Sequence, residues 1–352
     1  MKFNPFNIIL LLFTTVFLVR CGSSSREFEN PEQGFVSWKP APEWQDALLS
    51  GNGTMGTMVF GDPHEETLIV NHALHYLPNW TPQEPIDQAS RLDEIRALLS
   101  EGRYHEAAKI PVEQSMEEGY GEKKWIDPFV PFCHIDLSMP AGNIQNYRRM
   151  VDFRTGEAKV EWEQDGEHLQ RSLFVSRPDS LIVMRITGSD EVSASLRLKQ
   201  HPVDWDQWDD INRAIKNVQT SAKDGYLTYS TEFQRKWGEN PDGFEGVARV
   251  VPSGGETSYE DDRMIIENAE EILVLMRVVP NYDFDRSLTG ELKSVLAGYE
   301  TAYEELLHDH KQEHGDLFGR VNLDLGDLGE GSSVENLQSE AFVHKAREKT
   351  TP

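Results

Sequence analysis

The sequence predicts a mainly β protein in which two large antiparallel sheets pack face to face. From residue 147 onward, short runs of aliphatic and β-branched residues follow one another almost without pause. Some of these runs alternate with polar residues and others are apolar throughout, a mixture typical of packed sheets. Two stretches with helical spacing, at 86–114 and beyond 285, add helices to this β framework.

The N-terminal residues resemble a bacterial lipoprotein signal. Lys2 precedes an apolar run, 8–19, which suits a secretory signal and is too short to span a bilayer. Cys21 then stands where a lipobox places the lipidated cysteine, although Arg20 replaces the usual small residue, so simple secretion remains the alternative. We predict a signal peptide at 1–21, a tether at 22–34, and an exported bacterial protein that contacts the cell-envelope membrane only through a lipid anchor on Cys21.

The first strands and a helical hairpin follow. The segments 57–61 and 67–71 predict two short strands joined by a turn at Asp62. Between Ile86 and Gln114, apolar residues recur at helical spacing, Asp87 or Ser90 can cap the start, and Gly102 separates two helices.

The strand-rich region begins with a clear hairpin. Asp165-Gly166 is a two-residue turn signal between alternating runs, in which Val160 and Trp162 are expected to face inward and Glu161 outward. Further strands are predicted at 181–187, 193–200, 226–233, 246–253 and 272–280. Beyond Asp285, helical spacing returns through Leu296 and, after Gly298, continues towards Phe318.

The charge of the chain excludes one class of partner. There are 34 Lys and Arg against 60 Asp and Glu, a formal net charge of −26. The electrostatic potential of such a negatively charged chain repels a polyanion, so no nucleic-acid partner is expected. The acidic residues are scattered and 38% of residues are hydrophobic, which favours a folded protein with a neutral ligand.

Several blocks carry a family likeness. The chain contains, in order, LLSGNGTMGTMVFGD at 48–62, LIVNHALHYLPNW at 68–80, LDEIRALLSEGRYHEAAKI at 92–110, PFVPFCHIDL at 128–137, the segment 147–188, and HDHKQEHGDLFGRVNLDLG at 308–326. This order resembles the front of glycoside hydrolase family 95, the α-L-fucosidase and α-L-galactosidase family, over roughly residues 38–326.

The resemblance implies a large two-sheet antiparallel β-supersandwich at 35–284, with an inserted helical hairpin, and a C-terminal helical linker with a truncated tail at 285–352. In the family an (α/α)6 toroid follows and holds a Glu general acid and an Asp base that work with inversion. We expect that toroid to be missing from this chain and to be its partner. No catalytic residue, metal ligand or cofactor is therefore predicted here.

The resemblance and the residue chemistry together suggest a sugar site. Asn71, His72, His75, Tyr76 and Trp80 combine amide and imidazole groups with aromatic faces, as sugar sites do, and a glycan or oligosaccharide is the predicted partner. The alternative is a cluster facing the core or a domain interface. Many family members read Asn-Glu-Asp where this chain has Asn71-His72-Ala73, which favours a branch with another substrate.

Three other patterns are interpreted as structural. Gly51, Gly53, Gly56 and Gly61 lack the Lys-Ser/Thr of a phosphate loop and are expected to serve tight turns. The carboxylates Asp204, Asp206, Asp209 and Asp210 lack the glycine and terminal Glu of a calcium loop, so we expect an acidic surface loop. His308, His310 and His314 lack the Glu of a catalytic zinc motif.

The sequence thus predicts the N-terminal domain of an exported glycoside hydrolase that resembles an inverting α-L-fucosidase or α-L-galactosidase and is inactive alone. Two alternatives remain open: a stand-alone glycan-binding or scaffold lipoprotein, and the sandwich domain of a related sugar phosphorylase.

Overall fold

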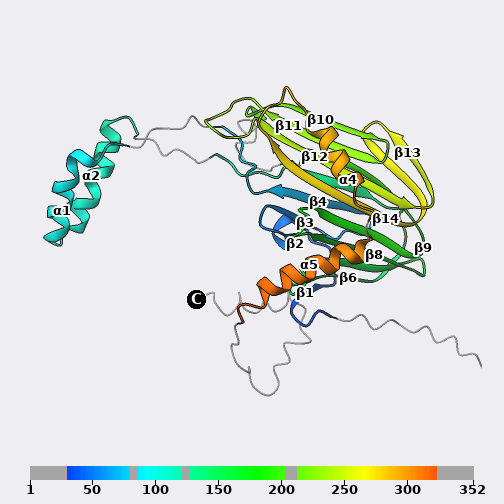
Figure 1. Cartoon of the computed structure of the whole chain (residues 1–352). Coiled ribbons are helices and arrows are strands. Elements are labelled where there is room, and N and C mark those ends of the chain that lie inside the picture. The colour runs from blue at the N-terminus through cyan, green and yellow to red at the C-terminus, as the bar shows by residue number, and fades with distance from the viewer. Residues whose placement is uncertain (1–29, 80–85, 121–126, 203–211, 301, 323–352) are drawn as a thin grey trace, which may run out of the picture. The chain divides into compact units, whose positions relative to one another are not determined.

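The computed structural model describes residues 30–79, 86–120, 127–202, 212–300 and 302–322. Within these residues the strands are antiparallel and form one continuous hydrogen-bonded sheet (Figure 1). The strands are β1 (Gly34–Ser37), β2 (Leu48–Gly51), β3 (Met55–Val59), β4 (Glu65–His72), β5 (Cys133–Ser138), β6 (Ile144–Asp152), β7 (Glu157–Gln164), β8 (Glu167–Val175), β9 (Ile182–Lys199), β10 (Ile215–Lys223), β11 (Tyr226–Phe233), β12 (Gly243–Ser253), β13 (Glu256–Glu260) and β14 (Arg263–Asn281). The mainly β prediction is confirmed.

The sheet curls so that two halves face each other. One half has the order β1-β6-β7-β8-β9-β14-β12-β11-β10, and the other runs β2-β3-β4-β5-β9. Strands β9 and β14, of 18 and 19 residues, belong to both halves. The first part of β9 pairs with β8 and its last part pairs with β5, so the expected sandwich is made from one sheet rather than from two separate ones.

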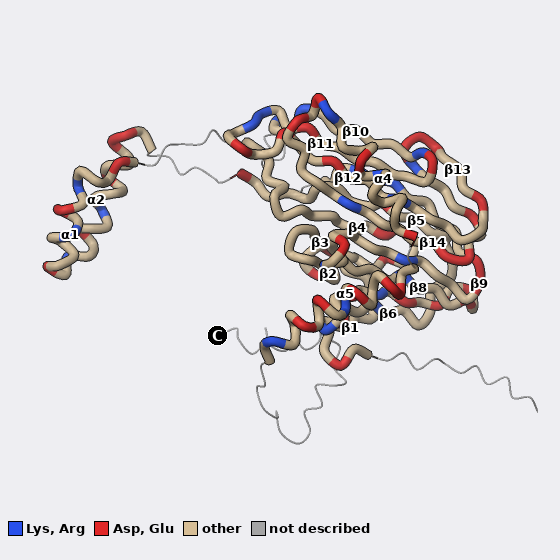
Figure 2. The backbone as a smooth tube through the Cα atoms, viewed as in Figure 1, with Lys and Arg blue, Asp and Glu red and all other residues tan. Residues whose placement is uncertain are grey.

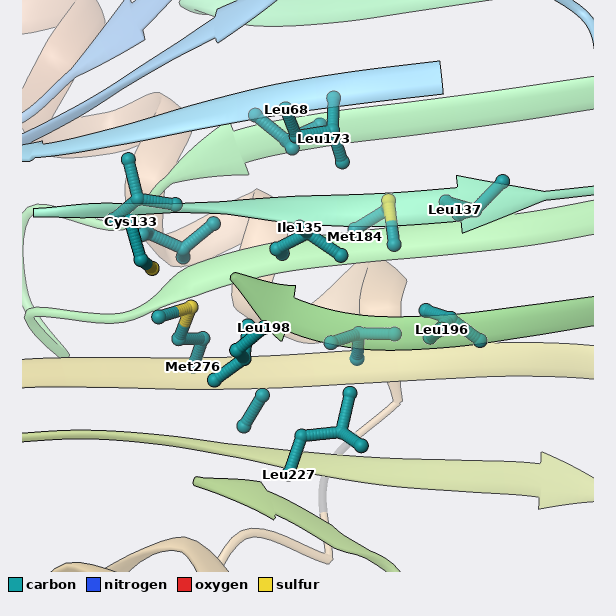
Figure 3. Packing of buried hydrophobic residues seen from close by; sticks show 14 of the residues in the cluster. Leu68, Cys133, Ile135, Leu137, Leu173, Met184, Leu196, Leu198, Leu227 and Met276 are labelled. Atoms are coloured by element: carbon teal, nitrogen blue, oxygen red, sulfur yellow. The ribbon is translucent and has the colours of Figure 1, made fainter. Parts of the chain in front are cut away.

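The main core lies between the two halves. Leu68, Ile135 and Leu137 from one half meet Leu173, Met184 and Leu227 from the other in a single cluster of buried side chains (Figure 3). This follows from the alternation of each strand, which places every second side chain on the inner face.

Two stretches of the strand prediction were wrong. The predicted strands 181–187 and 193–200 are one strand, β9, which continues through Gly188–Glu191. Its partner β14 has register irregularities between Ile266 and Glu271, and both strands pass from one half of the sheet to the other in this region. The segment between β12 and β14, expected to be a loop, contains the short strand β13.

The predicted helices are present. The inserted hairpin consists of α1 (Leu92–Ser100) and α2 (Tyr104–Glu117), and Asp87 accepts a hydrogen bond from the Ala89 N–H before the first turn. The C-terminal helices α4 (Thr289–Ala297) and α5 (Tyr303–Phe318) pack Leu292, Leu296 and Leu306 against the outer face of β8, β9, β12 and β14 in a second buried cluster.

Charged residues of both signs are interspersed over the strands and loops (Figure 2). None of the described helices is long and apolar enough to cross a membrane.

Candidate functional site

The predicted sugar-site residues lie at the end of β4 and in the loop that follows it. Adjacent residues of a strand point to opposite faces, so Asn71 and His72 cannot line the same pocket. His72 is buried, its ring centroid lies 5.1 Å from that of Phe244, and its Nδ1 accepts a hydrogen bond from the Leu74 N–H at 3.2 Å. Burial lowers the pKa of His72, so it is a neutral core residue. Asn71 is half-buried on the other face, opposite Gly56 of β3.

His75 is a second core imidazole. Its side chain is 2% exposed, and its ring centroid lies 4.8 Å from that of Phe244 and 5.7 Å from that of Phe132. Burial lowers the pKa of His75 to about 4, although a bond to the Val130 carbonyl opposes this shift. Because Nδ1 lies 3.0 Å from that carbonyl oxygen, Nδ1 carries the proton and donates it. The structure therefore places His75 where it supports the loop from inside.

Tyr76, next along the loop, faces outward. Its side chain is 46% exposed and its ring centroid lies 5.1 Å from that of Phe129. Tyr76 lines a surface cavity of about 460 Å³, which we call the tyrosine hollow. The residues that give it its chemistry are Tyr76, Asp127, Phe233, Glu239, Asn240 and Tyr282.

Of the predicted residues, the structure brings only Tyr76 to this hollow. Trp80, Cys21 and the carboxylates Asp204, Asp206, Asp209 and Asp210 lie outside the described residues. Sequence reasoning missed Asp127, Glu239, Asn240 and Tyr282. These residues come from three segments that are far apart in the chain, and no local spacing marks them as neighbours.

The glycine-rich stretch forms part of the sandwich. Strands β2 and β3 pair across it, and Gly61 follows them with a positive φ of 85°. The N–H groups of Phe60 and Gly61 donate to the buried carboxylate of Glu66, which is paired with Arg171 at 2.6 Å. Backbone donors that could have held an anion are thus occupied by the protein.

Two of the three histidines of α5, His310 and His314, contact the sandwich. His310 stacks on Phe174 of β8 with ring centroids 5.0 Å apart, and its Nδ1 accepts a bond from the Arg177 N–H at 3.3 Å. His314 Nε2 lies 3.0 Å from the Phe153 carbonyl oxygen, and His308 is exposed. Among the described residues, no group of three or more His, Cys, Asp or Glu side chains is arranged to hold a metal ion.

Comparisons with known proteins find similar sequences. Residues 36–285 match the sequence profile of a family described as "Glycosyl hydrolase family 65, N-terminal domain". An α-L-fucosidase 2 of Arabidopsis thaliana is 23% identical over 384 residues, an alignment that covers 96% of this chain and 44% of that protein.

Among solved structures, a protein described as a kojibiose phosphorylase from the human microbiome superposes with a TM-score of 0.47 and 10% identity. The superposition covers 82% of this chain and 39% of that one. The chain therefore spans less than half the length of either relative.

Proposed function

The chain belongs to the family described as glycosyl hydrolase family 65, N-terminal domain, and we propose that it is the sandwich domain of an exported α-L-fucosidase-like hydrolase. The substrates would be α-L-fucosyl or α-L-galactosyl residues of glycans. The observation that carries the proposal is the similarity to an α-L-fucosidase over 96% of the chain, which extends beyond the sandwich into the C-terminal helices.

The catalytic carboxylates belong, in this proposal, to a toroid outside the present sequence. Inversion needs two carboxyl groups about 6.5–9.5 Å apart, one to protonate the leaving oxygen and one to activate water. More than half of the fucosidase relative lies beyond the aligned region, which leaves room there for such a domain. The chain alone is then inactive, and its role is to support and complete the catalytic domain.

Export and lipid anchoring are part of the same proposal. The apolar run 8–19 followed by Cys21 supports them. Mass spectrometry of the mature protein from its native host should find Cys21 at the N-terminus with a diacylglycerol group. An unmodified Cys21 would exclude the lipid anchor and leave simple secretion.

A glycan-binding protein without catalysis is the second candidate. The tyrosine hollow favours it, because exposed aromatic rings beside carboxylate and amide groups are the usual elements of a sugar-binding surface.

The deciding experiment compares two products of the gene. The DNA downstream of the Pro352 codon is sequenced, and residues 22–352 and the longest reading-frame product are assayed on an aryl α-L-fucoside, with and without phosphate. We expect turnover with inversion by the longer product and none by 22–352.

Turnover by 22–352 would refute its inactivity, and dependence on phosphate would identify a phosphorylase. Unrelated downstream DNA together with saturable glycan binding would favour the binding protein.

A further inference from the structure

The tyrosine hollow joins four segments of the sandwich. The loop after β4 contributes Tyr76, the segment before β5 contributes Asp127, and the connection from β11 to β12 contributes Glu239 and Asn240. Tyr282, directly after β14, completes it. We propose that this hollow is a subsite for a neutral sugar unit, held against the rings of Tyr76 and Tyr282. The inference takes its ligand class from the proposed function.

The two tyrosines provide the apolar contact. Tyr76 and Tyr282 are 46% and 50% exposed, and both line the hollow. The CH faces of a pyranose ring pack on aromatic faces of this kind, while the phenol hydroxyls remain able to hydrogen-bond. A tyrosine loses little conformational freedom on binding because it has only two side-chain torsions.

Hydrogen bonds hold the backbone of the segments that line the hollow. The Tyr76 N–H donates to the Leu74 carbonyl at 2.9 Å, and the Leu77 N–H donates to the Pro128 carbonyl at 3.0 Å. Asp127 accepts the Asn79 N–H at 3.0 Å, which ties the first two segments together. The Tyr282 carbonyl accepts a hydrogen bond from Lys236 at 3.1 Å, which ties the residue after β14 to the connection from β11 to β12. When a ligand binds, backbone segments held in this way lose little conformational entropy, so less of the binding free energy is spent on ordering them.

The polar lining suits hydroxyl groups. The carboxylate oxygens of Asp127 and Glu239 accept hydrogen bonds, and the Asn240 amide can both donate and accept. Sugar hydroxyls donate and accept in the same way. The volume of about 460 Å³ lies within the range of about 300–1,000 Å³ found for small-ligand sites.

The charge of the hollow selects against acidic sugars. Its described lining includes two carboxylates and no Lys or Arg, and the whole chain carries a formal charge of −26. The nearby Lys236 ammonium is paired with the Asp242 carboxylate at 3.0 Å. A uronate or sulfated sugar would meet repulsion that a fucosyl or galactosyl unit does not.

Calorimetric titration of the chain tests the site. The probes are a fucosylated trisaccharide, its unfucosylated disaccharide, and a glucuronate-terminated disaccharide. Tyr76→Ala and Tyr282→Ala should each raise Kd for the best neutral probe by about fivefold to tenfold. Tyr76→Phe, which keeps the ring, should stay close to wild type. Tyr259→Ala is the matched control, because Tyr259 is 42% exposed but lies on β13.

The outcomes separate this inference from the proposed function. Unchanged affinity in both alanine variants, absence of binding by the wild type, or equally tight binding of the glucuronate probe would overturn the neutral-sugar subsite. If the longer gene product still hydrolyses fucosides in any of these cases, the proposed function stands without it. Loss of affinity only in Tyr76→Ala and Tyr282→Ala, with a normal melting temperature, supports the subsite.

Discussion

At the scale of single residues, buried imidazoles make the stability of the domain sensitive to pH. His75, His134 and His310 are all buried, and burial lowers the pKa of each to about 4. His310 shows the cause most clearly, because it stacks on Phe174 and lies beside both His314 and Arg177, where a further positive charge is unfavourable.

The pH dependence follows with a definite sign. Between pH 6.5 and about 4 the unfolded chain protonates His310 while the folded chain does not, so the free energy of unfolding decreases as pH falls through that window. The slope should be at most about 1.4 kcal/mol per pH unit for this histidine. Urea unfolding at pH 7, 6 and 5 should show a shallower slope for His310→Gln than for wild type. Leu306→Ala, on the same helix, should lower stability equally at each pH, and equal slopes in all three proteins would contradict the prediction.

The buried Glu66–Arg171 pair gives a second prediction. Both side chains are at most 3% exposed, and the Arg171 guanidinium also lies 5.2 Å from the Trp162 ring centroid. Arg171→Met leaves the Glu66 carboxylate buried without its countercharge, which should cost about 3–5 kcal/mol of unfolding free energy. Adding Glu66→Gln should recover part of this loss, since the amide oxygen can still accept the Phe60 and Gly61 N–H groups.

Chemical denaturation measures these costs. Arg91→Ala breaks the exposed Arg91–Glu94 pair and is the control, with an expected effect of at most about 1 kcal/mol. If Arg171→Met lowered the free energy of unfolding no more than Arg91→Ala does, the buried Glu66–Arg171 pair would not contribute to stability as described.

The sequence predicted burial poorly for polar side chains that have a hydrogen-bonding or charged partner elsewhere in the fold. The alternation around Trp162 predicted an outward Glu161, yet Glu161 is buried because Arg148 of β6 pairs with it at 2.8 Å. His72 and His75 were chosen for their hydrogen-bonding groups, but the Nδ1 atom of each bonds to the backbone and the rings pack on phenylalanines. Such partners lie on other strands, so spacing within one segment cannot reveal them.

At the scale of elements, helix α4 depends on a carboxylate from the sheet. Glu245 of β12 accepts hydrogen bonds from the Leu288 N–H, the Ser287 and Thr289 hydroxyls, and the Asn281 amide. Burial alone would raise the pKa of Glu245, but these bonds outweigh it and hold the pKa below its ordinary value. Glu245 therefore caps the helix and contributes most while it is ionised.

Removing the Glu245 carboxylate should destabilise α4 locally before it affects the rest of the domain. Glu245→Ala should lower the free energy of unfolding by about 1–3 kcal/mol near neutral pH, and less as pH falls below the pKa of Glu245. Hydrogen exchange should speed up at α4 amides in particular. Glu291→Ala, within α4 itself, is the control, and uniform exchange across the domain would argue against a local cap.

Sequence patterns within single segments predicted most of the helices and strands. The Asp165-Gly166 turn has positive φ at both residues, 53° and 96°, which is the geometry that this dipeptide favours. The boundaries of α4 and α5 follow the expected spacing and the Gly298 break. The continuity of β9 was not predictable in this way, since Gly188–Glu191 has the composition of a turn, and the residues on both sides of it, Thr187 and Val192, pair with the same strand, β14.

At the scale of the whole molecule, the two halves of the sandwich should unfold together. They share β9, β14 and one core, so neither half can lose its inner face without exposing the other. Leu137→Ala and Leu227→Ala lie in different halves, and each should lower the free energy of unfolding by about 2–5 kcal/mol. Tryptophan fluorescence and far-UV circular dichroism should report one coincident transition in both variants. Separate transitions would mean that the halves are independent units.

The shared strands also determine when the chain can begin to fold during synthesis. The last part of β9 is flanked by β5 on one side and β14 on the other, and β14 is the last strand in chain order among the described residues. Until β14 leaves the ribosome, β9 keeps an unpaired edge along its whole length, and the earlier strands have an incomplete core. Pairings between segments so distant in the chain form slowly and leave apolar edges exposed to aggregation. We therefore expect a nascent chain that ends before Arg263 to need chaperones, and a premature stop there to yield no folded half.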